Sequence, residues 1–430
     1  MKYDPIDSKL FIENRKKFAA QIKPNSVAIF MSNDQFPRSA DGQFMWRQDA
    51  DIFYLTGIDQ EDSMLMIYPD CPREEYREVL FLRQTNETIA VWEGKKYLQE
   101  EGTKASGIKN VLWNTEFNSV LNTIMCYAEN VYLNLNEHDR AVVEVPYKNY
   151  RFAHELMKRF PLHHYERAAK IMHALRSIKS ETEIALIINA ISITEKAFNR
   201  ILKFVKPGVT EYEVEAEITH EFIRNRATGH AYSPIIASGK NANVLHYIDN
   251  NLPCNDGDML LMDFGAEYAN YAADLTRTIP VNGKFTVRQK EIYNAVFSVM
   301  KQARSMLRPG LNLHEYNTKT VGNLMEQELL SLGILKKEDV AKQDANKPLY
   351  KKYFMHGTSH YLGLDVHDLG NRFATVAPGM VFTCEPGLYI PEEGIGIRIE
   401  NDILITDGEP IDLMASFAIE ADEIEAMMKG

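Results

Sequence analysis

The chain has 430 residues, of which 45% are hydrophobic and 25% charged, and its formal net charge is −12. This length exceeds one ordinary hydrophobic core, so we expect two domains. The acidic balance argues against a nucleic-acid partner, because nucleic-acid binders carry a basic surface, and no run of about 18 apolar residues suggests a membrane span.

The N-terminus, MKYDPIDSKLF, lacks the apolar stretch of a secretory signal. The four cysteines lie far apart and form no CxxC pair: Cys71, Cys126, Cys254 and Cys384. Such spacing argues against a disulfide framework or a structural zinc site and fits a reducing compartment. We therefore expect a cytoplasmic protein.

Residues 1–170 are predicted to form an N-terminal α/β domain. Apolar residues at helical spacing over 10–22 precede a series of short apolar segments. The predicted strands are 27–31, 52–55, 64–68, 79–82 and 131–135. Histidines, cysteines and acids do not cluster in this region, so the sequence predicts no catalytic site there.

Residues 174–430 are predicted to form a second domain with an internal repeat. Ser180 and Glu183 have the spacing of a capping box and open a long helix to about Lys206. Pro-Gly pairs at 207–208 and 309–310 each end one helix and precede another, and strands follow at about 232–280 and 354–406. Ordinary helix capping explains the Pro-Gly pairs alone. The matching order of elements favours two similar helix-sheet halves, with a site where their sheets meet.

The segment MDFGAEYANYAAD at 262–274 is predicted to be a hairpin with an aspartate in each strand. A turn at Tyr268-Ala269 places Asp263 and Asp274 directly opposite each other on one face. Like charges at opposed positions destabilise a sheet, and a buried carboxylate requires a partner. The hairpin therefore predicts a cation between the two aspartates.

The second half carries histidines at 356, 360 and 367. His356 and His360 are four residues apart, but Gly357 and the hydroxyl residues after it are poor helix formers. We expect a loop that runs into a strand rather than a helical zinc pair. Three histidines within twelve positions favour a functional site over isolated packed side chains.

The segment GIGIRIEND at 394–402 alternates like a strand. Ile395, Ile397 and Ile399 occupy one face, and Arg398 and Glu400 occupy the other. Alone, the segment would be interpreted as an exposed strand with a salt-bridged polar face. Glycines in that polar face also fit the close approach of a ligand.

Four acids and one histidine lie on strands or strand ends of the two halves: Asp263, Asp274, Glu385, Glu400 and His360. An oxygen-rich set with one imidazole suits manganese, cobalt, iron or magnesium. Two such cations, about 3.5–4 Å apart, can hold a shared hydroxide as nucleophile at neutral pH. The sequence therefore predicts a hydrolase.

At these residues the chain resembles the aminopeptidase P (Xaa-Pro aminopeptidase) group of the pita-bread metallopeptidases. The resemblance rests on Asp263 with Asp274 eleven residues later, preceded by His246, and on three further motifs. These motifs are HGTSHYLGLDVHD at 356–368, CEPGLYI at 384–390 and GIRIEND at 396–402, in that order. The segment WRQDADIFYLTG at 46–57 resembles the N-terminal domain of the same group.

The resemblance implies a mixed α/β (α+β) fold, with an N-terminal α/β domain and a C-terminal pita-bread domain of two pseudo-repeated halves. It implies two divalent metal ions, with manganese expected. Asp263 would bind one metal, His360 and Glu385 mainly the other, and Asp274 and Glu400 would bridge them.

The resemblance also assigns roles around the metals. Glu385 would take the proton of the attacking water. The histidines His246, His356 and His367 would contact the substrate and transfer protons. Arg398 and Tyr232 would line the substrate pocket. The implied reaction releases the N-terminal residue of a peptide with proline at the second position, through attack of a metal-bridging hydroxide.

Three alternatives remain open. A prolidase would use the same residues but cleave only Xaa-Pro dipeptides. A metal-free relative would act on a small amidine, and a non-catalytic protein would keep the fold without the reaction; five filled ligand positions argue against both. The resemblance further implies a homo-oligomer, either a dimer or a tetramer.

Overall fold

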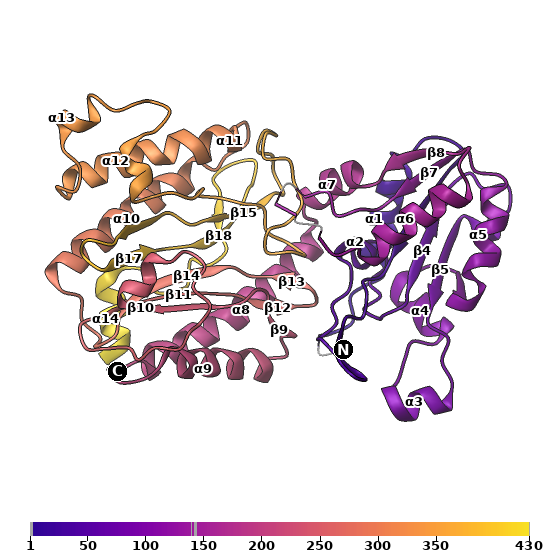
Figure 1. The fold of residues 1–430 in the computed structure, drawn as a ribbon, viewed down its shortest axis with the longest axis horizontal. Coiled ribbons are helices and arrows are strands. Elements are labelled where there is room, and N and C mark those ends of the chain that lie inside the picture. Colours follow the sequence, from indigo (N-terminus) through magenta and orange to yellow (C-terminus); the bar gives the residue numbers. More distant parts are fainter. Residues whose placement is uncertain (1–2, 139, 142–143, 430) are drawn as a thin grey trace. The chain divides into compact units, whose positions relative to one another are not determined.

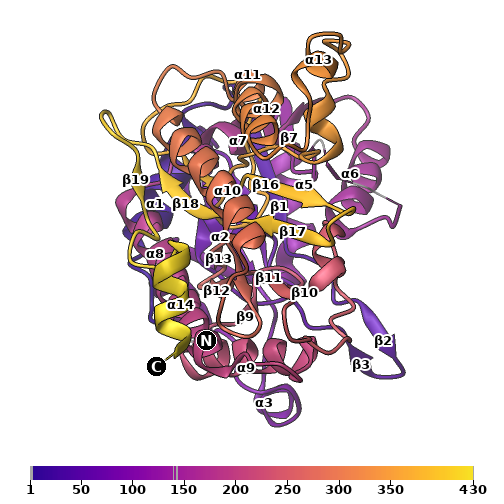
Figure 2. The ribbon, with the colours of Figure 1, turned by 90° about the vertical axis from the view of Figure 1, so that its left-hand side faces the viewer.

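The computed structural model describes residues 3–138, 140–141 and 144–429. The chain divides between Leu175 and Arg176 into two compact units (Figures 1 and 2). The N-terminal unit comprises residues 4–175, and the C-terminal unit comprises Tyr3 and the described residues from Arg176 onward.

The N-terminal unit contains a six-stranded sheet in the order β6-β5-β4-β1-β7-β8. The strands are β1 (Ser26–Met31), β4 (Met64–Ile67), β5 (Glu78–Leu82), β6 (Asn110–Trp113), β7 (Asn130–Leu133) and β8 (His164–Arg167). The helices are α1 (Lys9–Ala19), α2 (Ala50–Thr56), α3 (Glu87–Glu93), α4 (Gln99–Ser106), α5 (Phe117–Met125), α6 (Lys148–Arg159) and α7 (Ala169–Ser177), which runs into the C-terminal unit. A small hairpin joins β2 (Pro37–Ser39) to β3 (Gly42–Gln43). Apolar side chains of β1, β4, β5 and β7 pack against α5 and α6 to form the core of this unit.

The prediction of a strand at 52–55 is wrong, because this segment lies within helix α2. Asp49 caps the helix by accepting hydrogen bonds from the N–H groups of Asp51 and Ile52, and Gly57 ends it with a φ of 67°. Residues 51–56 are all buried. A helix buried on every side shows no polar face, so its period cannot be read from the sequence.

The C-terminal unit consists of two halves with the same order of elements, which confirms the predicted duplication. The first half has α8 (Glu181–Phe204), α9 (Glu211–Arg224), β9 (Gly229–His230), β10 (Ile235–Ser238), β11 (Met259–Phe264), β12 (Ala266–Tyr268), β13 (Tyr271–Ala272) and β14 (Leu275–Pro280). The second has α10 (Val287–Met306), α11 (Leu313–Glu315), the π-helix η4 (Tyr316–Thr320), α12 (Val321–Ser331), β15 (Val381–Cys384), β16 (Gly387–Ile390), β17 (Ile395–Arg398) and β18 (Asn401–Leu404). Shorter elements are η3 (Gly239–Asn243), α13 (Lys337–Val340), β19 (Ile411–Asp412) and the terminal α14 (Ala421–Lys429).

The sheets of the two halves meet at an isolated antiparallel bridge between Thr276 and Glu400. The N–H of Glu400 donates to the carbonyl oxygen of Thr276 at 3.0 Å. Helices α8 and α9 lie on one side of the strands, and α10 and α12 lie on the other (Figure 1). The strands are thereby covered on both sides, which explains why most of their residues are buried.

The prediction of one continuous strand across 394–402 is wrong, because the structure has two strands there, β17 and β18. Strand β17 pairs with β16, whereas β18 pairs with β15, so the segment changes sheets between Arg398 and Asn401. The polar face is not exposed either: the exposed fractions of Arg398, Glu400 and Asp402 are 4%, 2% and 0%. The polar residues of this segment therefore point into the interior.

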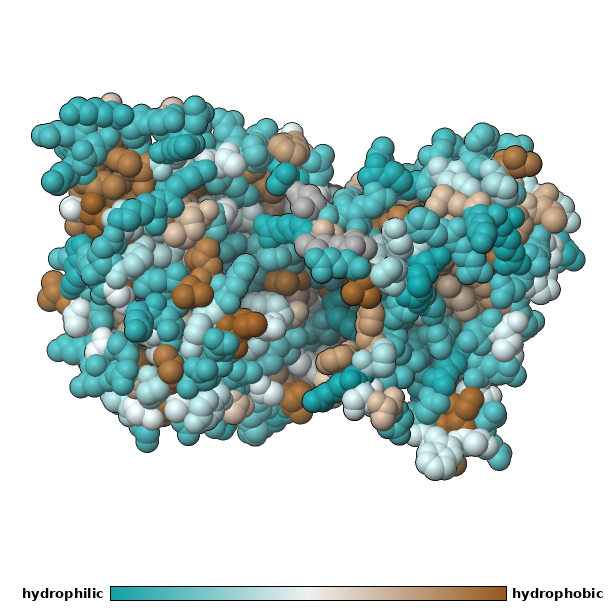
Figure 3. Space-filling view, in the orientation of Figure 1, coloured by the Kyte–Doolittle hydropathy of each residue, from teal (hydrophilic) through white to brown (hydrophobic). Residues whose placement is uncertain are grey.

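The surface drawn in Figure 3 is largely hydrophilic, with hydrophobic residues in small separate groups. In the described part of the chain, none of the helices combines the length and apolar character needed to cross a membrane.

Candidate active site

The predicted metal ligands come from the ends of strands in both halves. Asp263 lies on β11, and Asp274 lies immediately before β14. Glu385 follows β15, and Glu400 precedes β18. His360 lies in the loop before the isolated bridge formed by residues 361 and 382. The structure therefore brings together residues that are up to 137 positions apart in the sequence.

The two aspartates share a face of the hairpin, but they are not directly opposite. Strand register pairs Asp263 with Thr276, and the turn is centred on Ala269 and Asn270, with φ values of 52° and 65°. The predicted turn was one residue too early, so Asp274 lies diagonally from Asp263. A diagonal arrangement still allows both carboxylates to approach one cation.

Tyr232 and Arg398 contact the carboxylates of the first half. The hydroxyl of Tyr232 donates to Oδ1 of Asp263 at 2.6 Å and also contacts Oδ1 of Asp274. Arg398 Nη2 lies 2.6 Å from the second carboxylate oxygen, Oδ2, of Asp263. The structure thus places both predicted substrate-lining residues at the carboxylates.

His360 connects the two halves. Its Nε2 atom lies 3.4 Å from Oδ2 of Asp274 and 3.5 Å from Oε1 of Glu385. Its Nδ1 donates to the carbonyl oxygen of Tyr361 at 3.0 Å. Because a carbonyl can only accept, Nδ1 carries a proton and Nε2 is the atom available for a metal.

Three of the predicted ligands, Asp274, His360 and Glu400, offer atoms within 4.8 Å of one another. A carboxylate oxygen of Glu400 also accepts a hydrogen bond of 2.5 Å from the hydroxyl of Thr276. The contacts to Glu385 and Asp263 extend this group on either side, so the five side chains form one continuous cluster.

The cluster contains four carboxylates and one imidazole, so its negative charges repel one another. Burial, together with neighbouring carboxylates, raises the pKa of Asp274 and Glu400, and it raises the pKa of Glu385 to about 7. Burial disfavours the charged form of His360, but Asp274 and Glu385 outweigh that effect and raise its pKa. Buried carboxylates of this kind are stabilised by paired cations. The donor set, four carboxylates and one imidazole, fits hard divalent metal ions.

The structure places two of the three accessory histidines, His356 and His367, beside this cluster. His356 Nε2 lies 2.8 Å from the hydroxyl of Tyr389, and its Nδ1 lies 3.8 Å from Oε2 of Glu385. Burial and the positive charge of Arg398 lower the pKa of His356 to about 3, so its ring is neutral. The ring of His367 packs edge-on against the ring of His360, with centroids 4.5 Å apart.

His246 lies in the turn after η3 and is exposed. It is near enough to His356 for its charge to contribute to lowering the pKa of that ring. The described structure shows no hydrogen bond from His246 to the carboxylates.

Sequence reasoning missed two residues that hold the site. Tyr389, on β16, accepts a hydrogen bond from Arg398 Nη1 at 2.8 Å and contacts His356. Asn317, on η4, accepts from the N–H groups of Thr358 and Ser359 at 2.9 Å each. Tyr389 lies in the CEPGLYI segment and could have been noticed there, whereas nothing near Asn317 in the sequence indicates its role.

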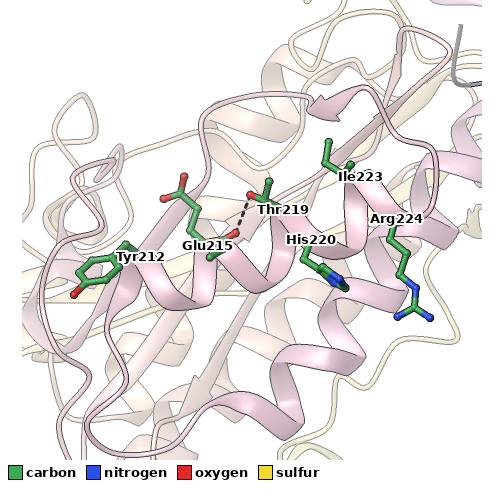
Figure 4. Close-up of a pocket in the computed structure, with 7 residues that line it drawn as sticks. Tyr212, Glu215, Thr219, His220, Ile223 and Arg224 are labelled. Carbon is green, nitrogen blue, oxygen red and sulfur yellow. Dashed lines mark hydrogen bonds between the residues drawn. The ribbon is translucent and has the colours of Figure 1, made fainter.

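The structure also contains a cavity of about 700 Å³ on the exposed face of α9 (Figure 4). Its lining residues are Tyr212, Glu215, Ala216, Thr219, His220, Ile223 and Arg224. None of the predicted site residues lines it. The cluster of carboxylates and His360 therefore lies in a different part of the C-terminal unit.

Comparison with known proteins defines the class of this chain. The model of metallopeptidase family M24 matches residues 185–407, more than half of the chain. The chain belongs to this family, and it is a metal-dependent hydrolase.

Within the family the chain belongs with the aminopeptidases P, as its motifs predicted. The model of the aminopeptidase P N-terminal domain matches residues 11–132. The Xaa-Pro aminopeptidase of Escherichia coli K12 is 36% identical over 98% of both chains. A putative aminopeptidase P from Bacillus anthracis has the same fold, with a TM-score of 0.91, 33% identity and 99% of both chains covered. Aminopeptidase P from E. coli with the inhibitor Pro-Leu gives a TM-score of 0.86 at 35% identity and 99% coverage of both chains.

Proposed function

We propose that the five clustered side chains hold two divalent cations, with manganese as the physiological metal, and that the enzyme removes an N-terminal residue that is followed by proline. The observation that carries this proposal is the cluster itself. Asp263, Asp274, Glu385, Glu400 and His360 are joined by direct or bridged contacts and lie beside the guanidinium of Arg398, which contacts Asp263. The oxygen-rich donor set supports manganese over softer metals.

When bound, the metals would supply an activated water nucleophile at neutral pH. Asp263 would hold one metal, His360 and Glu385 mainly the other, and Asp274 and Glu400 would bridge them. Glu385, which lies 3.8 Å from His356 Nδ1 and 3.5 Å from His360 Nε2, would accept the proton of the attacking water.

The remaining polar side chains would act on the peptide. His356 is neutral, and its one N–H, on Nδ1, donates to the carbonyl oxygen of Gly357 at 2.7 Å. It would stabilise the developing negative charge by releasing that carbonyl, without adding a buried cation. His367 and His246 would complete the contacts to the scissile bond and transfer protons. Arg398 and Tyr232 would line the pocket, where they already contact the carboxylate of Asp263.

Selectivity for proline would come from shape. The Xaa-Pro bond has no N–H to donate, so a pocket shaped for the ring must provide the selectivity. The solved E. coli relative carries the inhibitor Pro-Leu. A dipeptide that begins with proline has the form of the product left after an N-terminal residue is removed from Xaa-Pro-Leu. This similarity supports cleavage of peptides longer than the dipeptide.

The test is a peptide panel on metal-stripped protein to which one metal is returned at a time. We expect Mn²⁺ to restore cleavage of Xaa-Pro-Yaa peptides and not of matched Xaa-Ala-Yaa peptides. Cleavage confined to Xaa-Pro dipeptides would identify a prolidase instead. Absence of both metal binding and cleavage would identify a non-catalytic protein.

The proposal includes a cytoplasmic location and self-association as a dimer or tetramer. The four cysteines are unpaired, which supports a reducing compartment. Light scattering on the purified chain would give the number of subunits.

A further inference from the structure

A buried cluster of charges lies outside the proposed ligand set. Lys179 Nζ lies 2.9 Å from Oδ2 of Asp368, and each side chain is only 1% exposed. Arg176 Nη2 contacts the other carboxylate oxygen of Asp368 and lies 2.7 Å from Oδ2 of Asp365. Lys179 Nζ also donates to the carbonyl oxygen of Arg176 at 2.7 Å. Lys179 and Arg176 therefore hold the two oxygens of the Asp368 carboxylate. Both cations lie at the start of the long segment of the C-terminal unit, which begins with Arg176.

This cluster is connected to the proposed metal site through the backbone. The N–H of Asp368 donates to the carbonyl oxygen of Tyr361 at 3.0 Å. The same carbonyl accepts the 3.0 Å hydrogen bond from Nδ1 of His360. Asp368 also directly follows His367, whose ring packs against that of His360. Both histidines are thus positioned by the loop that Asp368 closes.

Gly363 packs closely against the buried charges. A Cβ at this position would lie 2.1 Å from Oδ2 of Asp368 and 2.9 Å from Cε of Lys179. The carbonyl oxygen of Gly363 accepts a 2.8 Å hydrogen bond from the N–H of Ala272, two residues before Asp274. The loop therefore connects the buried charges to both halves of the site.

Fold stability alone does not account for this arrangement. Burying an ion pair removes its charges from water, and well-packed apolar residues of similar volume often stabilise a protein as much or more. What a buried, hydrogen-bonded charge does impose is one geometry for the groups that contact it. In metal sites, the groups that orient a ligand histidine through its second nitrogen commonly set metal affinity.

We propose that Asp368, held by Lys179 and Arg176, is a positioning residue for the reaction. It fixes the Tyr361 carbonyl that orients His360, and it fixes the place of His367. This inference rests on the proposed function, because it takes His360 as a metal ligand and His367 as a substrate contact.

The test compares the wild-type full chain with the double variant Lys179→Met/Asp368→Asn. Removing both charges together avoids leaving one unpaired charge buried, and Arg176 keeps its contact with Asp365. We expect a folded protein in which the dissociation constant for Mn²⁺, measured by titrating metal-stripped protein, rises about 10–100-fold. We also expect kcat on an Xaa-Pro-Yaa peptide to fall by a similar factor.

The N-terminal unit offers a matched control. Lys96 and Glu61 form an ion pair with 14% and 9% of their side chains exposed, and Arg83 also contacts the carboxylate of Glu61. In the variant Lys96→Met/Glu61→Gln, Arg83 keeps its contact with Glu93. This control should match the wild type in Mn²⁺ affinity and kcat.

A second variant, Gly363→Ala, perturbs the same cluster without changing any charge. Its methyl group must displace Asp368 from Lys179, so Mn²⁺ affinity and kcat should again fall. If the double variant fails to fold, this variant decides the question. Wild-type Mn²⁺ affinity and kcat in a folded form of either variant would overturn the inference. If the wild type itself neither binds Mn²⁺ nor cleaves the peptide, the proposed function fails instead.

Discussion

Replacing Asn317 with alanine should weaken catalysis by loosening the loop that carries His356 and His360. The Asn317 amide makes three hydrogen bonds to this loop: it accepts from the N–H groups of Thr358 and Ser359 at 2.9 Å each and donates to the Ser359 carbonyl at 2.7 Å. Each such bond contributes about 1 kcal/mol net, so the variant loses about 3 kcal/mol of loop-holding energy.

If that whole loss falls on the transition state, kcat/KM decreases by roughly 100-fold, which sets the upper limit. We expect a decrease of about tenfold or more, measured on an Xaa-Pro-Yaa peptide at saturating Mn²⁺. The variant Asn317→Asp keeps an oxygen that accepts from both N–H groups but sets a second oxygen against the Ser359 carbonyl oxygen, so it should also lose activity. An alanine variant that unfolds more easily yet keeps kcat/KM within about twofold of the wild type would refute the reasoning.

Three further predictions concern the cluster and its support. Asp274→Asn or Glu400→Gln should abolish peptide cleavage because each disturbs a proposed metal bridge; a near-full rate with metal still bound would contradict that assignment. Metal removal should make the free energy of unfolding depend on pH. Burial raises the pKa of Glu385 from its ordinary value of 4.5 to about 7 in the folded, metal-free protein. The protonated carboxyl therefore stabilises the folded state fully below pH 4.5, and this stabilisation is lost as the pH rises through about 7. The thermal midpoint of metal-free protein should therefore fall between about pH 5 and pH 8, whereas metal-loaded protein should not show this loss. Arg277→Met should lower the free energy of unfolding by about 3–5 kcal/mol, measured by denaturant titration, because the fully buried Arg277 donates four hydrogen bonds whose acceptors would lose their partner; a loss below about 1 kcal/mol would contradict this role.

Local chemistry predicted the elements whose signals lie within a few residues. The capping box at Ser180 and Glu183 opens α8 as expected, because the Ser180 N–H donates to the Glu183 carboxylate at 2.8 Å. The duplication of the C-terminal unit was also predictable, since each half repeats its elements in order. Helix α2 was missed because it is buried on all sides and has no amphipathic period.

The pairing of the two hairpin strands depends on which two residues form the turn, and a shift of one residue changes the partner of Asp263. Positive φ at Ala269 and Asn270 moved the turn by one position, and Asp274 moved from opposite Asp263 to a diagonal position. The side-chain face was nevertheless predicted correctly, because residues 274 and 276 share a face in an alternating strand.

The supports of the candidate site could not be predicted from spacing. Asn317 is more than forty positions from the backbone groups that it holds, and Lys179 is 189 positions from Asp368. No periodicity connects such residues, because only the packing of the two halves brings them together. The resemblance to a family named the ligands but said nothing of these contacts.

The contacts of Arg176 and Lys179 also change where the catalytic part of the chain begins. The family model spans residues 185–407, yet both cations precede it, and the carbonyl of Ala418, which receives a hydrogen bond from Arg277, follows it. A fragment cut at 185 and 407 would keep every proposed ligand and lose groups that fix the His360 loop and Arg277. For any attempt to express the catalytic unit by itself, the minimal fragment therefore starts before Arg176 and extends beyond Ala418.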